Sequence, residues 1–297
     1  MHNNHRIHMK IDLNKGMEYS KLEIKKEIEG ILSKNLGVSS LQVQLTNGAN
    51  GALQEVISQL ALKYFNENRK NPIALISTPN FWYTERFLNS SFYKIVKVKR
   101  NKQFRFQTEK FIEQIRLKKP FLTILTTPNN PTGIPIDIED IYQIMNSISE
   151  NAYIIIDKAC LNIGKEINLK ELLNQSQHIN LILIDSYSKS HNLSSERIGW
   201  FACSNESTAK YFRESEDIAR VTYSSMCSLM KVIDNNTILI KNKHKIKQSI
   251  NLLKEFGVKN PSFEYSNTKS NFVMAMISSL HQKKLLEKFD FIYPNTP

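Results

Sequence analysis

The sequence predicts an α/β fold built on a mostly parallel sheet. Short apolar runs bounded by glycine, proline and polar residues are typical of buried strands. Amphipathic helical stretches alternate with these runs, and this alternation is typical of chains that place parallel strands in one sheet. With 297 residues, of which 41% are hydrophobic and 23% charged, the chain is long enough for one large domain and a small one.

The expected elements follow in order along the chain. A helix over 19–36 ends at a glycine cap, Gly37. The stretch from Val43 to Ala52 reads as a short strand that runs into a glycine-containing turn, and the next helix carries its apolar stripe from Leu53 to Tyr64. Further strands are expected at 73–77, 92–98, 121–127, 153–157, 180–184, 198–204 and 271–276, and further helices at 111–115, 138–148, 207–233, 238–256 and 280–289.

The formal net charge of +12 raises the question of nucleic acid, because a basic surface attracts phosphates. The lysines are scattered through helical stretches such as 241–247, however, and no RNA-binding signature or zinc-finger spacing occurs. We interpret them as solvated faces that also favour anionic small molecules. The expected partner is therefore a small molecule, and no nucleic acid is expected.

Cysteine count and segment hydropathy favour a cytoplasmic protein. Three cysteines, an odd number without short-range pairing, argue against a disulfide framework. The start of the chain lacks the apolar core of a signal peptide, and no run approaches the length of a membrane span. His2, His5 and His8 could bind a metal, but a mobile tail is the better interpretation, and we expect no metal site.

The stretch from Ile184 to Trp200 is the strongest functional candidate. Lys189 follows a buried strand, at the carboxyl edge where open α/β sheets bind ligands, and there it could form a Schiff base with a carbonyl cofactor. Hydroxyls at Ser186 and Ser188 and the guanidinium of Arg197 suit a phosphate. The alternative is a surface lysine in a polar loop.

Four other strand ends carry polar or aromatic motifs. The glycine turn at 47–51 opens a helix and is a ready anion site, although such turns also occur for steric reasons. The loop Pro-Asn-Asn-Pro-Thr-Gly at 128–133 holds an asparagine stiffly over the sheet edge, or is only a polar turn. Asp157 ends an apolar strand and needs a partner there. Three adjacent aromatics at 81–83 are as easily explained by core packing.

Together these segments, in this order, resemble the class I/II aminotransferases, which are pyridoxal-phosphate enzymes of fold type I. The resemblance rests on Ser-x-Ser-Lys followed by Glu-Arg-Ile-Gly, on Asn-Pro-Thr-Gly and on the strand-end aspartate, and it covers roughly residues 40–275. It implies a three-layer α/β/α fold and a homodimer with its sites at the interface. Lys189 is then the Schiff-base lysine and shuttles a proton, with Ser186, Ser188, Arg197 and the amides of Ala49 and Asn50 on the cofactor phosphate.

The same resemblance implies the contacts of the cofactor ring. Phe81 lies over the ring, with Trp82 and Tyr83 as other candidates; Asn130 donates to the phenolic oxygen, and Asp157 pairs with the ring nitrogen. Tyr19 would reach the neighbouring subunit's phosphate.

Two departures from the family pattern bear on the reaction. Cys160 stands where these enzymes commonly have a tyrosine that hydrogen-bonds the phenolic oxygen, and a thiol is a weaker donor. The sequence also ends at Pro297, before the strand that usually carries the carboxylate-binding arginine. We therefore expect an aminotransferase, with a decarboxylase, lyase or oxidase of the same fold, or an inactive cofactor-binding homologue, as alternatives. The expected division is an N-terminal segment (1–40), a cofactor domain (41–235) and a small, shortened α+β domain (236–297).

Overall fold

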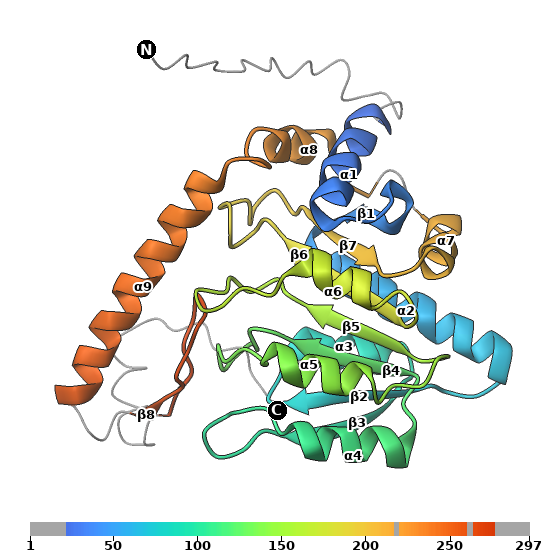
Figure 1. Ribbon diagram of the computed structural model, residues 1–297, viewed down its shortest axis with the longest axis horizontal. Coiled ribbons are helices and arrows are strands. Elements are labelled where there is room, and N and C mark those ends of the chain that lie inside the picture. Colours follow the sequence, from blue (N-terminus) through green and yellow to red (C-terminus); the bar gives the residue numbers. More distant parts are fainter. Residues whose placement is uncertain (1–21, 217–219, 260–263, 277–297) are drawn as a thin grey trace.

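A computed structural model describes residues 22–216, 220–259 and 264–276. Its centre is a seven-stranded sheet in the order β1-β7-β6-β5-β4-β2-β3 (Figure 1). Every strand except β7 runs in the same direction, because β7 pairs antiparallel with both β1 and β6 while the other pairs are parallel. The expectation of a mostly parallel sheet is confirmed. The strands are β1 (Val43–Thr46), β2 (Ile73–Thr78), β3 (Lys94–Lys99), β4 (Leu122–Thr126), β5 (Tyr153–Asp157), β6 (Asn180–Ser186) and β7 (Gly199–Cys203).

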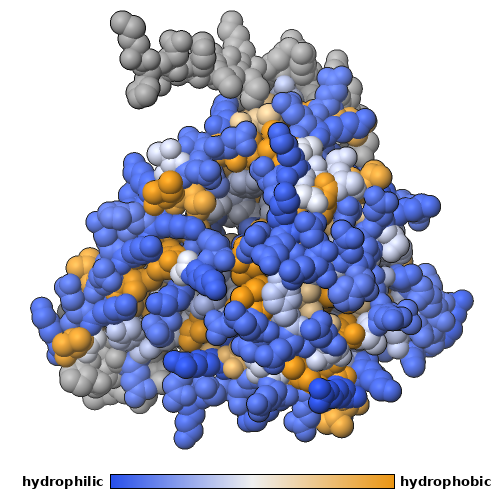
Figure 2. Space-filling model, viewed as in Figure 1, coloured by the Kyte–Doolittle hydropathy of each residue, from blue (hydrophilic) through white to orange (hydrophobic). Residues whose placement is uncertain are grey.

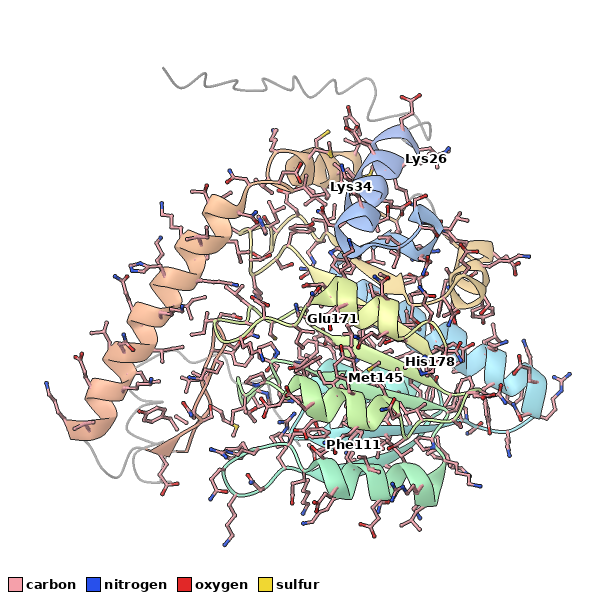
Figure 3. All side chains as sticks on the ribbon, viewed as in Figure 1. Lys26, Lys34, Phe111, Met145, Glu171 and His178 are labelled. Carbon is pink, nitrogen blue, oxygen red and sulfur yellow. The ribbon has the colours of Figure 1, made fainter. Side chains whose placement is uncertain are left out.

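Helices cover both faces of the sheet and give the three-layer arrangement. One face carries α1 (Leu22–Leu36), α4 (Thr108–Lys118), α5 (Ile138–Met145), α6 (Leu169–Gln175) and α8 (Tyr223–Met230), and the other carries α2 (Gly48–Asn68), α3 (Trp82–Ser90) and α7 (Glu206–Glu214). A 3₁₀ turn, η2 (Ser40–Gln42), joins α1 to β1. Figure 3 labels Phe111 of α4 and Met145 of α5, which are both buried in the core on the same face of the sheet as α1.

Strand β5 shows why these runs are apolar on both sides. Ile154 and Ile156 pack in the core on the α1 side, whereas Tyr153 and Ile155 pack in the core on the α2 side. Successive side chains of a strand point to opposite faces, so a strand in the middle of a three-layer fold must be apolar throughout. Each fully buried isoleucine contributes roughly 1.5–3 kcal/mol by leaving water.

The region 207–233 departs from the prediction of one long helix. It forms two helices, α7 and α8, instead. Each has its own N-cap: the Asn205 side chain accepts from the Thr208 N–H, and the Thr222 side chain accepts from the Ser225 N–H. A capping side chain satisfies the free amides of a new helix start, so Thr222 favours a second helix over continuation of the first. Helices α3 and α6 were not among the predicted elements.

The C-terminal part begins with α9 (Asn236–Lys259), which runs along one side of the molecule in Figure 1. The strand predicted at 271–276 is shorter, with β9 (Ala275–Met276) paired to β8 (Glu264–Tyr265). Between them, Lys269 N–H donates to Gly133 O (2.8 Å) and Ser270 Oγ to Leu161 O (2.9 Å), so this segment is fixed to loops at the sheet edge. The predicted helix at 280–289 and Tyr19 lie outside the described residues. None of the described helices combines the length and apolar character that crossing a membrane requires.

Candidate active site

A cavity of about 240 Å³ lies at the carboxyl edge of the sheet. Its wall includes all ten residues that the sequence singled out for a cofactor: Ala49, Asn50, Phe81, Asn130, Asp157, Cys160, Ser186, Ser188, Lys189 and Arg197. They come from the ends of five different strands or the loops beside them, which the strand order brings to one edge. The volume suits a ligand smaller than a typical drug molecule.

The N-terminus of α2 and Arg197 form one end of the cavity. No side chain caps α2, so the amides of Ala49 and Asn50 point into the cavity end without a partner among the described residues. The Arg197 guanidinium lies beside the same turn, because a Cβ added at Gly48 would come within 2.8 Å of its Nη2. Free amides, the positive end of a helix dipole and a guanidinium together make an anion site. This end fits a phosphate group.

Close approach of β7 to α2 depends on Gly199. A Cβ at Gly199 would lie 2.7 Å from the Ala49 nitrogen and 2.9 Å from Asp185 O. Any side chain would therefore push the amides of α2 away from the cavity. The glycine before Trp200 is thus part of the anion site, although it contributes no group to it.

Asp157 lies two strands away from β7, a distance of about 10 Å at ordinary strand spacing. It stands at the end of β5 in register with Thr126 of β4 and Ile184 of β6. Its Oδ1 accepts from the Ala159 N–H (3.0 Å), and among the described residues it forms no ion pair. Burial raises the pKa of its carboxyl to about 6, and the Ala159 hydrogen bond only partly opposes this. A cationic ring nitrogen beside it would favour the charged form.

Lys189 lies in a tight turn after β6. The N–H groups of His191 and Leu193 both donate to Tyr187 O (3.1 and 3.3 Å) and close this turn around the lysine. The lysine is exposed and lines the cavity, and neither it nor Arg197 forms an ion pair with another described residue. An amine at the cavity wall without a carboxylate partner is available to react with a ligand.

Cys160 lies close enough to both Asp157 and Lys189 for their charges to affect it. Burial raises the pKa of its thiol well above the ordinary value; Asp157 adds to this rise, and Lys189 opposes it. The thiol therefore stays protonated at neutral pH. It can act as a weak hydrogen-bond donor in the cavity but not as a thiolate nucleophile.

The two adjacent asparagines at 129–130 have different roles. Asn129 is fully buried and fixes the loop: its N–H donates to Ile134 O (3.0 Å), and its Nδ2 donates to Pro79 O (3.3 Å). Asn130 lines the cavity. Of the three aromatics, Phe81 lines the cavity, whereas Trp82 is 46% exposed.

Sequence reasoning missed three residues of the cavity wall: Thr126, Ala159 and Ser194. Thr126 ends β4, and its buried Oγ1 has no hydrogen-bond partner among the described atoms, as expected for a group that a ligand completes. Ser194 also lines the cavity, and its carbonyl accepts from Arg197 Nη1 (3.0 Å), which orients the guanidinium. Thr126 could have been found by the signal that identified Asp157, which is a polar side chain at the end of an apolar strand. A backbone acceptor such as Ser194 O leaves no sequence signal.

The polar groups fit pyridoxal phosphate by their chemistry: an anion site at one end, a carboxylate for a ring nitrogen, an amine for an aldehyde and an unpaired hydroxyl between them. Three or more metal-ligating side chains do not gather anywhere in the described part of the chain. The predicted residues are thus brought together, while their contacts with a cofactor remain a prediction.

The chain is similar in sequence to known aminotransferases. The chain is 24% identical over 243 residues to a histidinol-phosphate aminotransferase from Thermoanaerobacter sp. (strain X514), a match that covers 82% of this chain and 65% of that protein. The chain thus spans just under two thirds of the length of this relative.

Two solved structures share the fold. Histidinol-phosphate aminotransferase from Sinorhizobium meliloti, solved in complex with pyridoxal-5'-phosphate, superposes with a TM-score of 0.72 at 16% identity, over 85% of this chain and 66% of that one. L-threonine-O-3-phosphate decarboxylase from Porphyromonas gingivalis gives a TM-score of 0.73 at 16% identity, over 94% of this chain and 81% of that one. These likenesses confirm the three-layer fold. The model of the family "Aminotransferase class I and II" matches residues 8–293, and this chain therefore belongs to that family of pyridoxal-phosphate enzymes.

Proposed function

We propose that this chain binds pyridoxal phosphate covalently through Lys189 and transfers the amino group of an amino acid or amine. The observation that carries the proposal is that Asp157, at the end of β5, lines a single cavity together with Lys189 and Arg197 from the loop between β6 and β7. An amine, a buried acid and an anion site are the three groups that this cofactor requires at its aldehyde, ring nitrogen and phosphate.

Each group of the cavity has a defined task in the proposed enzyme. Bound pyridoxal phosphate supplies an aldehyde that amines can join and a ring that withdraws electrons from the substrate Cα. Arg197 and the amides of Ala49 and Asn50 hold the phosphate, and Asp157 keeps a proton on the ring nitrogen. Lys189 Nζ holds the cofactor between turnovers and moves a proton at the substrate Cα, as general base and then acid.

The ring has two further contacts in this proposal. Phe81 limits its position from one face, and Asn130 donates its side-chain N–H to the phenolic oxygen. Cys160 offers a protonated thiol at the same cavity. The thiol is a weaker donor than a phenol, so the proton affinity at this end of the site should differ from that of a relative with tyrosine.

The fold does not choose the reaction, because an aminotransferase and a decarboxylase both superpose on this chain. Sequence similarity favours transamination, since the curated relatives are histidinol-phosphate aminotransferases. A phosphorylated amino alcohol of that kind is the first substrate to test, with free amino acids beside it. We also propose that two copies assemble, as the family resemblance implies, with residues of each completing the other's site.

Mass spectrometry tests the lysine directly. The purified protein is incubated with pyridoxal phosphate, reduced with borohydride and digested, and we expect the cofactor mass on the peptide that contains Lys189. Lys189→Ala should abolish this adduct, while Lys110→Ala, an exposed lysine of α4, should not. An adduct that persists in Lys189→Ala would exclude the assigned role.

A half-reaction separates the chemistries. With a panel of amino acids and amino alcohols, transamination converts the cofactor to its amino form and releases a carbonyl product. Release of carbon dioxide without that conversion would instead assign the chain to the decarboxylases.

A further inference from the structure

Helix α9 lies beside the loops that follow β5 and β6. None of its residues is buried, and Ile240, Leu252, Phe256 and Val258 are at least half exposed. Figure 2 shows hydrophobic side chains at the surface along this helix, between hydrophilic ones. A second cavity, of about 360 Å³, lies between the first turns of α9 and the loops after β5 and β6. The first turns of α9 are therefore not packed tightly against these loops, although Leu239 is half-buried there.

Polar contacts from two consecutive residues of α9 bridge this gap. Asn242 Nδ2 donates to Ser190 O (2.9 Å) and to Asn192 Oδ1 (3.0 Å). Lys243 forms an ion pair with Glu166, whose other oxygen lies 3.8 Å from Lys158 Nζ. The first contact reaches the residue after Lys189, and the second reaches the residue after Asp157.

The turn that carries Lys189 also has side-chain contacts of its own: Ser190 Oγ lies 3.5 Å from Ser186 O and 2.8 Å from His191 Nδ1. Its backbone hydrogen bonds converge on Tyr187 O and come from His191 and Leu193, on either side of Asn192. Asn192 adopts a left-handed conformation (φ 62°), which is uncommon for a residue with a side chain. Among the described groups, Asn242 is the donor that reaches Ser190 O. Its amide thus joins the middle of the turn to α9.

We propose that Asn242 is a positioning residue for Lys189. Its side-chain amide holds Ser190 and Asn192 in place. Lys189, which lies between the end of β6 and these two residues, is thereby directed into the cofactor cavity. The inference rests on the proposed function of Lys189, and it assigns to α9 the task of fixing the reactive amine relative to Asp157. A displacement of about 1 Å in a reacting group can cost on the order of 10²-fold in rate, so the anchor matters even though it is remote from the cofactor.

Hydrogen exchange in the cofactor-free full chain tests the anchor. Asn242→Leu, which keeps the volume but removes the donor, should speed amide exchange at 188–193 about tenfold, and Asn242→Gln should restore part of the protection. Lys241→Ala changes the adjacent, exposed residue of the same helix and should leave the turn unchanged. Unchanged exchange in Asn242→Leu, or acceleration spread equally over β5, would overturn the proposal.

The rate of covalent attachment supplies the second readout. After addition of pyridoxal phosphate, samples are quenched with borohydride at intervals, and the adduct at Lys189 is counted by mass spectrometry. We expect attachment to slow about tenfold in Asn242→Leu and to recover in Asn242→Gln, with an unchanged thermal midpoint. Wild-type rates in Asn242→Leu would contradict the positioning role. If the wild-type chain forms no adduct, the proposed function fails, and the exchange experiment still decides whether Asn242 holds the turn.

Discussion

Gly199 of β7 lies directly against the backbone of Ala49, the second residue of α2, with only 2.7 Å between an added Cβ and the Ala49 nitrogen. Two segments that are 150 positions apart in sequence thus meet without any side chain between them. The contact exists because β1 and β7 are neighbours in the sheet, which brings the start of α2 to the start of β7. It sets how closely the amides of α2 approach the proposed phosphate position.

Gly199→Ala should therefore weaken cofactor binding by at least about tenfold. The Cβ must displace backbone rather than a flexible side chain, so α2 shifts and its amides no longer converge with Arg197. Binding is measured by titration of pyridoxal phosphate against intrinsic fluorescence. Gly30→Ala is the matched control, because an added Cβ there meets nothing within 4 Å and a helix-interior alanine is favourable. Equal affinity of the two variants for pyridoxal phosphate would contradict the proposed anion site.

Arg197→Ala should discriminate between two ligands. If the guanidinium binds the phosphate, the variant loses affinity for pyridoxal phosphate, by about ten- to a hundredfold, and keeps its affinity for pyridoxal, which lacks the phosphate. Arg197→Lys should recover only part of the loss, because an ammonium cannot make the two-pronged contact. Competition with inorganic phosphate reports on the same end of the cavity. If the variant loses affinity for both ligands to the same extent, Arg197 does not act through the phosphate group.

Asp157→Asn should separate stability from function. Burial raises the pKa of the Asp157 carboxyl from 3.8 to about 6, so the folded cofactor-free protein keeps a proton that the unfolded chain releases. The stability that this proton contributes is complete below pH 4 and is lost as the pH rises through about 6. The difference corresponds to about 3 kcal/mol.

The variant removes this charge and keeps an oxygen for the Ala159 N–H. Without cofactor, we expect Asp157→Asn to be more stable than wild type above pH 6 and equally stable near pH 4, as measured by urea unfolding at several pH values. We expect the variant to bind pyridoxal phosphate more weakly than wild type does, because the amide cannot hold the ring-nitrogen proton. A stability difference that does not vary with pH would show that the carboxyl is not responsible.

Most of the sheet was predictable because its signals are local. The runs at β4, β5 and β6 are apolar, flanked by turn residues and buried on both faces, so their positions were correct to within one or two residues. The antiparallel direction of β7 was not predictable, since it depends on pairing with β1 and β6 rather than on its own residues. The separate start of α8 was not predictable from periodicity, because it is marked by a cap, Thr222, that the apolar pattern of 207–233 does not single out.

The cavity residues were found because each ends a strand or follows one, and strand ends meet at one edge of a parallel sheet. The roles that escaped prediction depend on contacts that the local sequence does not reveal. Gly199 stands in the Glu-Arg-Ile-Gly motif, but its role is to lie against α2. Ser194 acts through its carbonyl on Arg197, and Asn242 reaches the Lys189 turn from a helix 50 residues later. None of these has a residue type that is unusual for its local surroundings, so only the three-dimensional arrangement assigns them a role.

Glu29→Gln should destabilise the fold by about 3 kcal/mol. Glu29 is buried on α1, where its Oε1 accepts from Lys25 Nζ (2.6 Å) and from the Leu45 N–H (3.1 Å), and its Oε2 lies 3.1 Å from Arg213 Nη2. Removing its charge leaves Lys25 and Arg213 with Glu216 as their one remaining shared carboxylate, so two cations face one anion. The link between α1, β1 and α7 is weakened.

Urea unfolding checks this, with the slope of the transition as a test for two-state behaviour. Glu67→Gln is the control, because the Lys63–Glu67 pair on α2 is exposed and should contribute less than about 0.5 kcal/mol. If the two substitutions cost the same, the buried cluster is not a stabilising link.

Cys160→Tyr tests the departure from the family pattern. A phenol at this position is a stronger donor than the thiol, and it favours the anionic form of an acceptor oxygen on the cofactor. We therefore expect the pH midpoint of the visible absorbance change of the bound cofactor to fall by about one unit, equivalent to about 1.4 kcal/mol. Cys160→Ala removes the weak donor, and its midpoint should stay near that of wild type or rise slightly. If all three proteins titrate at the same pH, position 160 makes no hydrogen bond to the cofactor, and the raised pKa of the thiol reflects burial beside Asp157 alone.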